Sequence, residues 1–374
     1  METYLGENTK KLGFGLMRLP KKDGEIDVEQ MKEMVDLFMA AGFTYFDTAF
    51  VYSGSEEAMK KALIDRYPRE SFTVASKLAA WSGCKTREDA ISQFVTSLER
   101  SGAGYFDYYL LHNLGVSRTK FFDDFDVWNF VKQQKAEGKI KHIGFSFHSN
   151  AEELEEILIA HPEAEFVQLQ INYADWFSGD IQSKRVYEMA RKYNKPVVIM
   201  EPVKGGLLAD PPEAVAKILK NAAPDVSYAS WAIRFAASHE GVLTVLSGMS
   251  SVEQMKDNIS YMKDFRKLSP SEQDVISQAQ AEIAKYPLIP CTDCKYCTKV
   301  CPMNIGIPAT FSAMNMLILY NDLTRAQGRE KFHVTGMGKE LAENCIKCGQ
   351  CEEVCPQHIE IRKYLEEAVT ALHP

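Results

Sequence analysis

Short apolar runs alternate with amphipathic stretches from the start of the chain to about residue 265. Eight of these runs have the length and the β-branched and aromatic content of buried strands. We expect these strands at residues 12–19, 44–48, 72–78, 107–112, 142–147, 166–172, 196–200 and 242–248. Most intervening stretches carry apolar residues at helical spacing. In the first of them, residues 28–42, four apolar side chains share one face, namely Met31, Met34, Val35 and Phe38.

Strict alternation of strands and helices is typical of a parallel sheet, because parallel neighbours need a crossover connection that a helix supplies. Eight such units can close into a (β/α)8 TIM barrel. The alternative is an open doubly wound sheet. Gly13 and Gly15 come nearest to the G-x-G-x-x-G motif of that fold, but the third glycine is missing. We therefore predict an α/β fold with a TIM barrel.

The pattern changes after residue 265. Residues 266–290 predict one helix that ends in prolines, and we interpret this segment as a linker. We therefore expect two domains: a barrel with its trailing helix over residues 1–285 and a small domain over residues 286–374. A length of 374 residues suits this combination.

Eight of the nine cysteines form two copies of one spacing, C-x2-C-x2-C-x3-C-P. The first run is Cys291, Cys294, Cys297 and Cys301, and the second is Cys345, Cys348, Cys351 and Cys355. Bacterial ferredoxins hold two iron–sulfur clusters with this run, and thiolate sulfur suits such clusters. Zinc sites use one or two C-x2-C pairs, and disulfides need an oxidising compartment. The spacing therefore predicts two 4Fe–4S clusters.

The assignment of cysteines to clusters follows from the same run, because in two-cluster ferredoxins the fourth cysteine of each run binds the other cluster. We assign Cys291, Cys294, Cys297 and Cys355 to one cluster, and Cys345, Cys348, Cys351 and Cys301 to the other. In the simpler alternative, each run closes on its own cluster. The 44 residues from Cys301 to Cys345 look helical, so we expect a mostly helical ferredoxin-like module.

Four polar residues lie at or just beyond the C-terminal ends of predicted strands, where TIM barrels place catalytic groups. They are Asp47, Tyr52, Lys77 and His112. A free tyrosine has a pKa near ~10, and a neighbouring ammonium lowers it by stabilising the phenolate. Asp47 would keep Lys77 charged, and His112 would orient a substrate oxygen. Each residue alone would more often be structural, but the set of four predicts a proton-transfer site.

The segments FDTA-x4-Y, SK and LLH around these residues resemble the aldo/keto reductase superfamily, whose tetrad is Asp, Tyr, Lys and His. The resemblance covers about 265 residues, and the whole chain resembles the subgroup with a C-terminal ferredoxin-type domain. It implies that the tetrad residues are catalytic. It further implies that the nicotinamide cofactor NADP or NAD is bound by Ser146, Gln168, Asn172, Gly248, Gln254 and Asn258.

One departure from the family concerns the choice of cofactor. The family often has a basic residue shortly after the glycine of the phosphate loop, where it binds the 2′-phosphate of NADP. Here Met249, Ser250 and Ser251 follow Gly248. The preference between NADP and NAD therefore stays open, and we expect it to be weaker than is usual in the family.

The resemblance implies an NAD(P)H-dependent oxidoreductase that reduces a small-molecule carbonyl substrate, an aldehyde or ketone, with Tyr52 as proton donor. The alternative is an electron-transfer component whose clusters serve a flavoprotein or another redox protein partner. Nicotinamide gives two electrons as hydride, whereas each cluster takes one. A flavin normally joins such steps, and the sequence shows no flavin signature.

Composition changes this picture only by exclusion. A formal net charge of −8 argues against a nucleic-acid partner. No run of 18 apolar residues exists, so we expect no membrane span, and the first residues do not resemble a secretory signal. Reduced cysteines and clusters fit a cytoplasmic location.

Overall fold

The structure is a computed structural model that describes residues 5–6, 9–115, 118–179 and 181–374. It forms two compact units. The barrel unit contains Met1–Val203 and Ala229–Pro270, and the cysteine unit contains Lys204–Tyr228 and Ser271–Pro374. The domain boundary expected at residue 285 stays a prediction.

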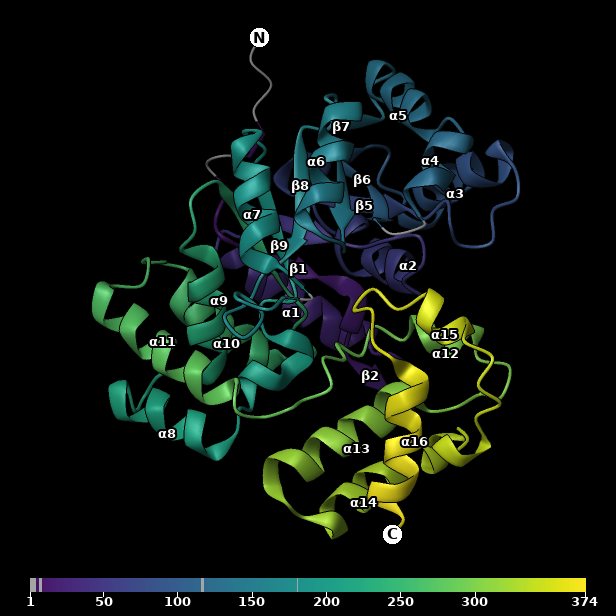
Figure 1. The fold of residues 1–374 in the computed structure, drawn as a ribbon. Helices are drawn as coiled ribbons and strands as arrows, with labels where there is room; N and C mark the ends of the chain where they lie inside the picture. The colour runs from purple at the N-terminus through teal and green to yellow at the C-terminus, as the bar shows by residue number, and fades with distance from the viewer. Residues whose placement is uncertain (1–4, 7–8, 116–117, 180) are drawn as a thin grey trace. The chain divides into compact units, whose positions relative to one another are not determined.

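Eight parallel strands close into a barrel in the order β1-β10-β9-β8-β7-β6-β5-β4 (Figure 1). They are β1 (Leu12–Gly15), β4 (Tyr45–Asp47), β5 (Thr73–Leu78), β6 (Phe106–Leu114), β7 (Ile140–Phe147), β8 (Phe166–Gln170), β9 (Val197–Met200) and β10 (Val242–Ser247). The predicted fold class is therefore confirmed. The first strand is shorter than predicted, because a 3-10 turn at Leu16–Arg18 follows it.

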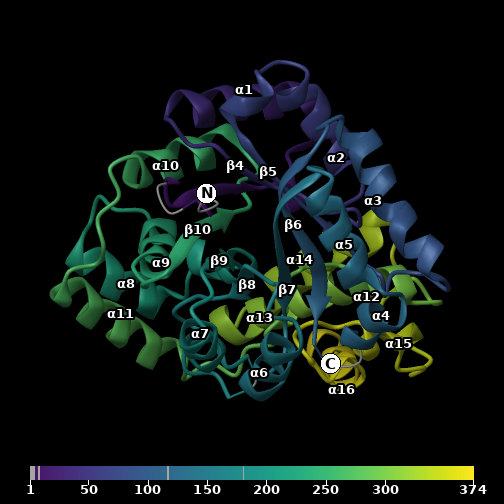
Figure 2. The same cartoon turned by 90° about the horizontal axis from the view of Figure 1, so that it is seen from above.

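Helices surround this ring of strands, as Figure 2 shows. They are α1 (Val28–Ala40), α2 (Ser55–Met59), α3 (Arg87–Ser101), α4 (Thr119–Asp124), α5 (Val127–Ala136), α6 (Ala151–Ala160), α7 (Ser183–Lys192), α9 (Tyr228–Ala237) and α10 (Val252–Met262). The apolar face predicted for α1 is fully buried, and the Asp27 side chain caps this helix by accepting from the Gln30 backbone. A small hairpin, β2 (Lys21–Lys22) and β3 (Glu25–Ile26), precedes α1. The hydrophobic pattern of the sequence did not predict this hairpin.

The interior of the barrel is filled by side chains from alternate strand positions. Tyr108 packs against Tyr45 and Phe166, with ring centroids 5.0 and 5.3 Å away. Position 144 has room only for a glycine, because a Cβ on Gly144 would lie 2.6 Å from the Phe166 carbonyl oxygen. Since side chains alternate along a strand, the residue two positions beyond each interior residue also points inward. This packed layer is the floor on which the site rests.

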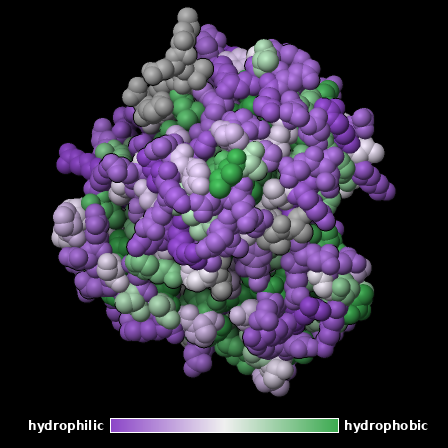
Figure 3. Space-filling model, turned by 45° about the horizontal axis from the view of Figure 1, so that its top comes forward, coloured by the Kyte–Doolittle hydropathy of each residue, from purple (hydrophilic) through white to green (hydrophobic). Residues whose placement is uncertain are grey.

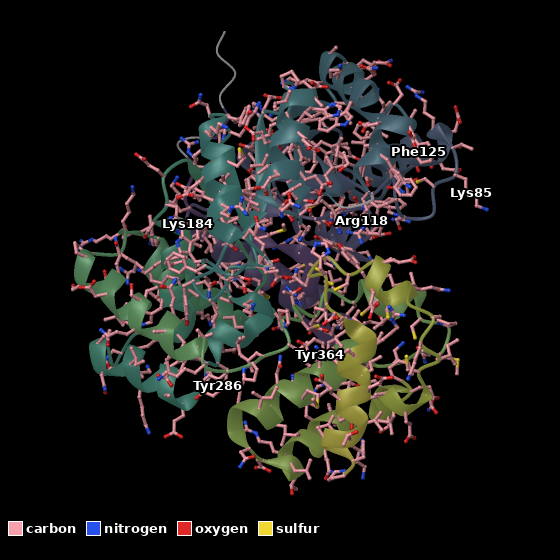
Figure 4. The ribbon with its side chains drawn as sticks, in the orientation of Figure 1. Lys85, Arg118, Phe125, Lys184, Tyr286 and Tyr364 are labelled. Carbon is pink, nitrogen blue, oxygen red and sulfur yellow. The ribbon has the colours of Figure 1, made fainter. Side chains whose placement is uncertain are left out.

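The cysteine unit is mostly helical, as predicted. Its helices are α8 (Glu213–Ala222), α11 (Pro270–Ile283), α12 (Tyr296–Val300), α13 (Ile307–Tyr320), α14 (Leu323–His333), α15 (Gln350–Glu353) and α16 (Ile361–Leu372). The helices α13, α14 and α16 contact one another. Phe311 of α13 and Tyr364 of α16, the latter labelled in Figure 4, are packed with ring centroids 6.0 Å apart.

A short parallel bridge between Ile305 and Glu340 pairs the segments that lie between the two cysteine runs. The backbone N–H of Gly306 donates to the Glu340 carbonyl at 3.0 Å, and the Glu340 N–H donates to the Asn304 carbonyl at 3.1 Å. The short helices α12 and α15, which carry Cys297 and Cys351, also contact each other. The segment that follows the first run therefore lies beside the one that precedes the second.

Residues 204–228 belong to the cysteine unit although they precede it by more than forty residues in the chain. Gly205 has a positive φ of 64°, and a Cβ on it would lie 3.1 Å from the Cα and carbonyl oxygen of Thr292. The chain therefore needs a glycine here, both for the left-handed backbone and for the close approach to the first cysteine run.

The surface is polar over most of the face drawn in Figure 3, where hydrophobic residues occur in small groups. Among the described residues, the large hydrophobic side chains that are exposed include Phe332, Met337 and Ile346 of the cysteine unit. Within the same part of the chain, no helix is both long and apolar enough to cross a membrane.

Candidate functional site

The site lies one layer above the packed floor of the barrel. Five site residues stand on strands, and each follows an interior residue by two positions, so that strand alternation points both inward. Asp47 follows Tyr45, Lys77 follows Ala75, His112 follows Leu110, Ser146 follows Gly144 and Gln168 follows Phe166. The local sequence of each strand therefore fixes both the floor and the site.

A buried ion pair forms the centre of this layer. The Lys77 ammonium donates to Asp47 Oδ1 at 2.5 Å and to the Thr48 carbonyl at 2.8 Å. The two side chains are only 1% and 4% exposed. Burial lowers the pKa of Lys77 and raises the pKa of Asp47, and the contact between them opposes both shifts. Because the low dielectric strengthens their attraction, each group holds the other in place.

Tyr52 and His112 complete the predicted group of four. The Lys77 Nζ lies 5.2 Å from the centroid of the Tyr52 ring. The Tyr52 and His112 rings meet edge to face, with centroids 5.8 Å apart and an interplanar angle of 85°. Tyr52 reaches this place from the turn after β4, where its backbone N–H donates to the Ala49 carbonyl. The structure thus brings all four predicted residues together.

Trp81 and Arg118 lie beside His112. The indole N–H of Trp81 donates to the His112 carbonyl at 2.7 Å, and the ring centroids of the two residues are 6.0 Å apart. The Arg118 guanidinium, labelled in Figure 4, lies over the Trp81 ring at 5.0 Å and is buried. Sequence reasoning missed Arg118, because a single arginine after a strand has no distinguishing pattern.

Glu56 is a second buried carboxylate near Lys77 that sequence reasoning also missed. It accepts from Ser76 Oγ at 2.8 Å, and Arg100 Nη1 approaches its other oxygen at 3.9 Å. Burial lowers the pKa of Lys77, and the charge on Glu56 opposes this shift after the larger effect of Asp47. The charge on Glu56 therefore helps to keep Lys77 protonated.

The residues expected at the nicotinamide lie on neighbouring strands. Ser146 of β7 and Gln168 of β8 are partners in the sheet register. Among the described residues, the buried Gln168 Oε1 has no hydrogen-bond partner. An unsatisfied buried acceptor costs about 1–3 kcal/mol, so a ligand that offers an amide N–H fits this position. Asn172, in contrast, donates to Asp175 Oδ2 and to the Glu201 carbonyl, and thus orders the loop after β8.

The residues expected at the cofactor phosphates surround the start of α10. Ser251 caps this helix by accepting from the Gln254 backbone N–H. The Gln254 side chain accepts from the Ser250 N–H at 2.8 Å, and Asn258 Oδ1 accepts from Ser247 Oγ at 2.7 Å. Gly248 follows β10 directly. A helix N-terminus with a preceding glycine favours an anion.

Arg18 supplies a basic group beside this loop. Its Nη1 lies 3.9 Å from the place that a Cβ on Gly248 would take, and its carbonyl accepts from Ser250 Oγ at 2.6 Å. Its Nη2 also pairs with Glu201 at 3.1 Å. The residues that follow Gly248 in sequence could not reveal this cation, because it comes from the turn after β1. The lack of a basic residue directly after Gly248 in the sequence therefore does not mean that the loop lacks a neighbouring cation.

Cysteines of both runs meet in the cysteine unit. A cavity there is lined by Cys301 of the first run and by Cys345, Cys348 and Cys351 of the second. We call these four residues the second cysteine set. Burial raises the pKa of Cys351 to about 11, with further contributions that include the charges of Cys345 and Cys301.

The other four cysteines form the first cysteine set, which consists of Cys291, Cys294, Cys297 and Cys355. Burial raises the pKa of Cys291 to about 12, and the charges of Cys294 and Cys355 add to this shift. None of the nine cysteines forms a disulfide. Across the described residues, no three His, Cys, Asp or Glu side chains are grouped so as to hold a single metal ion.

Two family models match successive parts of the chain. The model of the aldo/keto reductase family matches residues 11–281, and the model of the 4Fe-4S dicluster domain matches residues 290–360. An aldo-keto reductase from Mycobacterium sp. (strain MCS) is 34% identical over 155 residues, which are 41% of this chain and 50% of that protein. Glyoxal reductase from Bacillus subtilis (strain 168) is 30% identical over 138 residues, which are 36% of this chain and 47% of that protein. The chain thus spans about half the length of these curated relatives.

Solved structures share the barrel. An aldo-keto reductase from Bacillus halodurans in its holo form has a TM-score of 0.58 at 23% identity, over 72% of this chain and 91% of that chain. An aldo/keto reductase from Klebsiella pneumoniae in complex with NADP and acetate has a TM-score of 0.59 at 22% identity, with the same coverage. Since the family model matches most of the sequence, this chain belongs to the aldo/keto reductase family and carries a 4Fe-4S dicluster domain at its C-terminus.

Proposed function

We propose that this oxidoreductase uses NADPH or NADH to reduce an aldehyde or ketone, with Tyr52 as the proton donor. The observation that carries the proposal is the buried Lys77–Asp47 ion pair, whose ammonium lies 5.2 Å from the Tyr52 ring. A buried cation at this place stabilises a phenolate more strongly than one in water. Lowering a tyrosine pKa from ~10 to about 7 takes roughly 4 kcal/mol of such stabilisation.

The nicotinamide cofactor, when bound, supplies the hydride. Tyr52 gives its proton to the carbonyl oxygen as negative charge develops there, and Lys77 stabilises the phenolate that remains. His112 hydrogen-bonds the same oxygen and orients the substrate. Trp81 supports this role, because its indole N–H holds the His112 backbone.

The residues that would hold the cofactor follow from the contacts in the barrel. The orphaned Gln168 Oε1 and the neighbouring Ser146 suit the carboxamide of the nicotinamide. Gly248, Gln254 and Asn258 would bind the phosphate and adenine end, and Arg18 adds a positive charge there. Asn172 would act indirectly, because its amide is engaged with Asp175 and Glu201.

For the cysteine unit, we propose two 4Fe–4S clusters, one in each cysteine set. The cavity lined by the second set supports this crossed assignment, since it contains Cys301 together with three cysteines of the other run. Such clusters would supply one-electron chemistry. Cys348 is exposed, so the cluster of the second set would lie near the surface. This exposure favours a second role, electron exchange with a redox protein partner in a reducing cytoplasm.

The test of carbonyl reduction is the Tyr52→Phe variant, measured with NADPH and a panel of aldehydes and ketones. Loss of a general acid should lower turnover by at least about a hundredfold, while cofactor binding stays near that of the parent protein. Tyr193→Phe is the control, because it removes a phenol that donates to Glu155 on the outer side of the barrel. Substantial turnover by Tyr52→Phe would remove Tyr52 from its assigned role.

The test of the electron-transfer role is the absorbance of anaerobically purified protein before and after NADPH is added. Bleaching of the cluster band by NADPH alone would show that the two units exchange electrons without a partner. Bleaching only after a flavoprotein is added would support a redox partner. Clusters that no reductant bleaches at accessible potentials would be structural and would exclude the second role.

A further inference from the structure

The two cysteine sets differ in their surroundings. In the first set Cys297 and Cys355 are buried, whereas in the second set Cys348 is exposed and only Cys351 is buried. Next to the first set lies Asp293, but its carboxylate pairs with the Lys295 ammonium at 3.5 Å, so the two charges largely offset each other. Reduction adds one electron, and thus one negative charge, to a cluster. Burial opposes that charge, so it lowers the reduction potential of the first set.

Arg362 of α16 occupies a defined place at the second set. It lines the same cavity as Cys301, Cys345, Cys348 and Cys351. Its Cζ and Nη1 lie 3.8 Å from the position that a Cβ on Gly349 would take. Gly349 belongs to the turn that joins Cys348 to Cys351 and has a φ of 83°. The guanidinium therefore packs directly on a cysteine-bearing turn.

Glu352 holds Arg362 in this position. The Arg362 Nε and Nη2 both donate to Glu352 Oε2, at 2.9 and 2.7 Å, and the Arg362 backbone N–H donates to Oε1 at 2.8 Å. Three hydrogen bonds to one carboxylate leave the guanidinium little freedom. The pKa of Arg362 lies above its ordinary value, first because of Glu352 and then because the charges of Cys351 and Cys345 are close by.

We propose that Arg362, fixed by Glu352 against the Gly349 turn, sets the reduction potential of the second-set cluster and keeps it above that of the first-set cluster. This inference rests on the proposed clusters. Contact with water and the Arg362 guanidinium both stabilise the extra negative charge of the reduced state, the guanidinium by offsetting the Glu352 carboxylate. The cysteines of the first set are more buried, so a cluster there has less contact with water. An electron shared by the two clusters therefore stays on the second set, which is the set with an exposed cysteine.

The test uses the full-length protein with both clusters, in a redox titration followed by electron paramagnetic resonance. Arg362→Gln should lower the reduction potential of one cluster by ~59 mV, which corresponds to a tenfold change in its one-electron equilibrium constant. The reduction potential of the other cluster should stay unchanged. Arg362→Lys keeps the charge and should restore most of the potential. Lys363→Gln is the matched control, because Lys363 is the adjacent exposed cation and interacts with Glu360 instead of the cysteines.

Cys348→Ser identifies the signal of the second set, because it changes a ligand of that cluster alone. The inference is wrong if Arg362→Gln moves neither potential, if it moves the signal that Cys348→Ser leaves intact, or if the second-set cluster has the lower potential in the parent protein. Iron and acid-labile sulfide analysis separates this failure from that of the proposed function. Fewer than two clusters in the parent protein would contradict both.

Discussion

The two candidate sites of this molecule are built in opposite ways. In the barrel unit, the charged residues Asp47 and Lys77 stand on hydrogen-bonded strands whose register fixes their separation. In the cysteine unit, the ligands stand on turns and on helices of four and five residues, α15 and α12. The first site is complete as soon as the backbone has folded. The second gathers two sets of four thiols, whose mutual arrangement depends on short helices and turns.

The pKa shifts show what this difference means. In the barrel, burial disfavours both charges, but each charge is stabilised by the other. In the cysteine unit, burial raises the pKa of Cys291 and Cys351, and neighbouring thiolates raise it further because they repel. Only a positively charged metal core compensates four thiolates in such a place, so metal binding and folding are coupled there. The barrel site is preorganised by protein alone, and the cysteine site needs its metal.

The strongest test of this contrast removes a cluster ligand. Cys355→Ala should abolish the cluster of the first set and reduce iron and sulfide to roughly half, because Cys355 is the fourth ligand of that set. Cofactor binding by the barrel should persist. Cys84→Ala is the matched control, since the ninth cysteine belongs to the barrel unit. If spectroscopy shows the first-set cluster intact and the second-set cluster lost, the crossed assignment is wrong.

The converse test weakens the barrel site and leaves the cysteines unchanged. Lys77→Met should cut carbonyl reduction at neutral pH by about a hundredfold or more and shift the pH–rate profile upward, because the phenolate of Tyr52 loses its cation. Iron content should not change. Lys192→Met, which removes an ammonium paired with Glu155 outside the barrel, should leave the rate unaffected. A profile that does not move would contradict the electrostatic account.

The packing of the barrel unit can be tested through His239, whose ring stacks on Trp176 with centroids 4.3 Å apart. Burial lowers the pKa of His239 to about 4. The unfolded chain, with an imidazole pKa near 6.5, binds this proton first, so stability falls as pH drops from 7 to 5. The loss should be about 2 kcal/mol, measured by denaturant unfolding, and His239→Phe should remove it. An equal pH dependence in both proteins would show that His239 titrates normally.

The smallest expected effect concerns the cofactor. Arg18 lies beside Gly248 but shares its charge with Glu201, so we expect a preference for NADP over NAD below about a hundredfold, or ~3 kcal/mol. Arg18→Ala should weaken NADP binding by about tenfold and NAD binding by less, in titrations followed by fluorescence quenching. A preference above a hundredfold that survives in Arg18→Ala would show that another group binds the 2′-phosphate.

The sequence predicted the parts of both sites that depend on periodicity or spacing. The eight strands were visible because buried strands are short apolar runs, and the tetrad was visible because it follows the strand ends. Arg18, Glu56, Arg118 and Arg362 were not visible, since a single charged residue has no periodic pattern. Their roles arise from contacts between distant segments, such as Arg18 with Glu201. Residues 204–228 likewise carry no local signal that they belong to the cysteine unit. Their assignment arises from packing between distant segments, such as the close approach of Gly205 to Thr292.

Cysteines of both runs line one cavity, and the segments between the runs pair at Ile305 and Glu340. This arrangement has a consequence for biosynthesis. The ribosome makes the barrel strands first, and they can pair as they emerge. In the proposed crossed assignment, neither cysteine set has all four members until the second run, residues 345–355, has been made. The proposed clusters would therefore be inserted only after the barrel and both cysteine runs have been made. A truncated product that stops before residue 345 would contain a complete barrel and one full cysteine run, yet no complete set of cluster ligands.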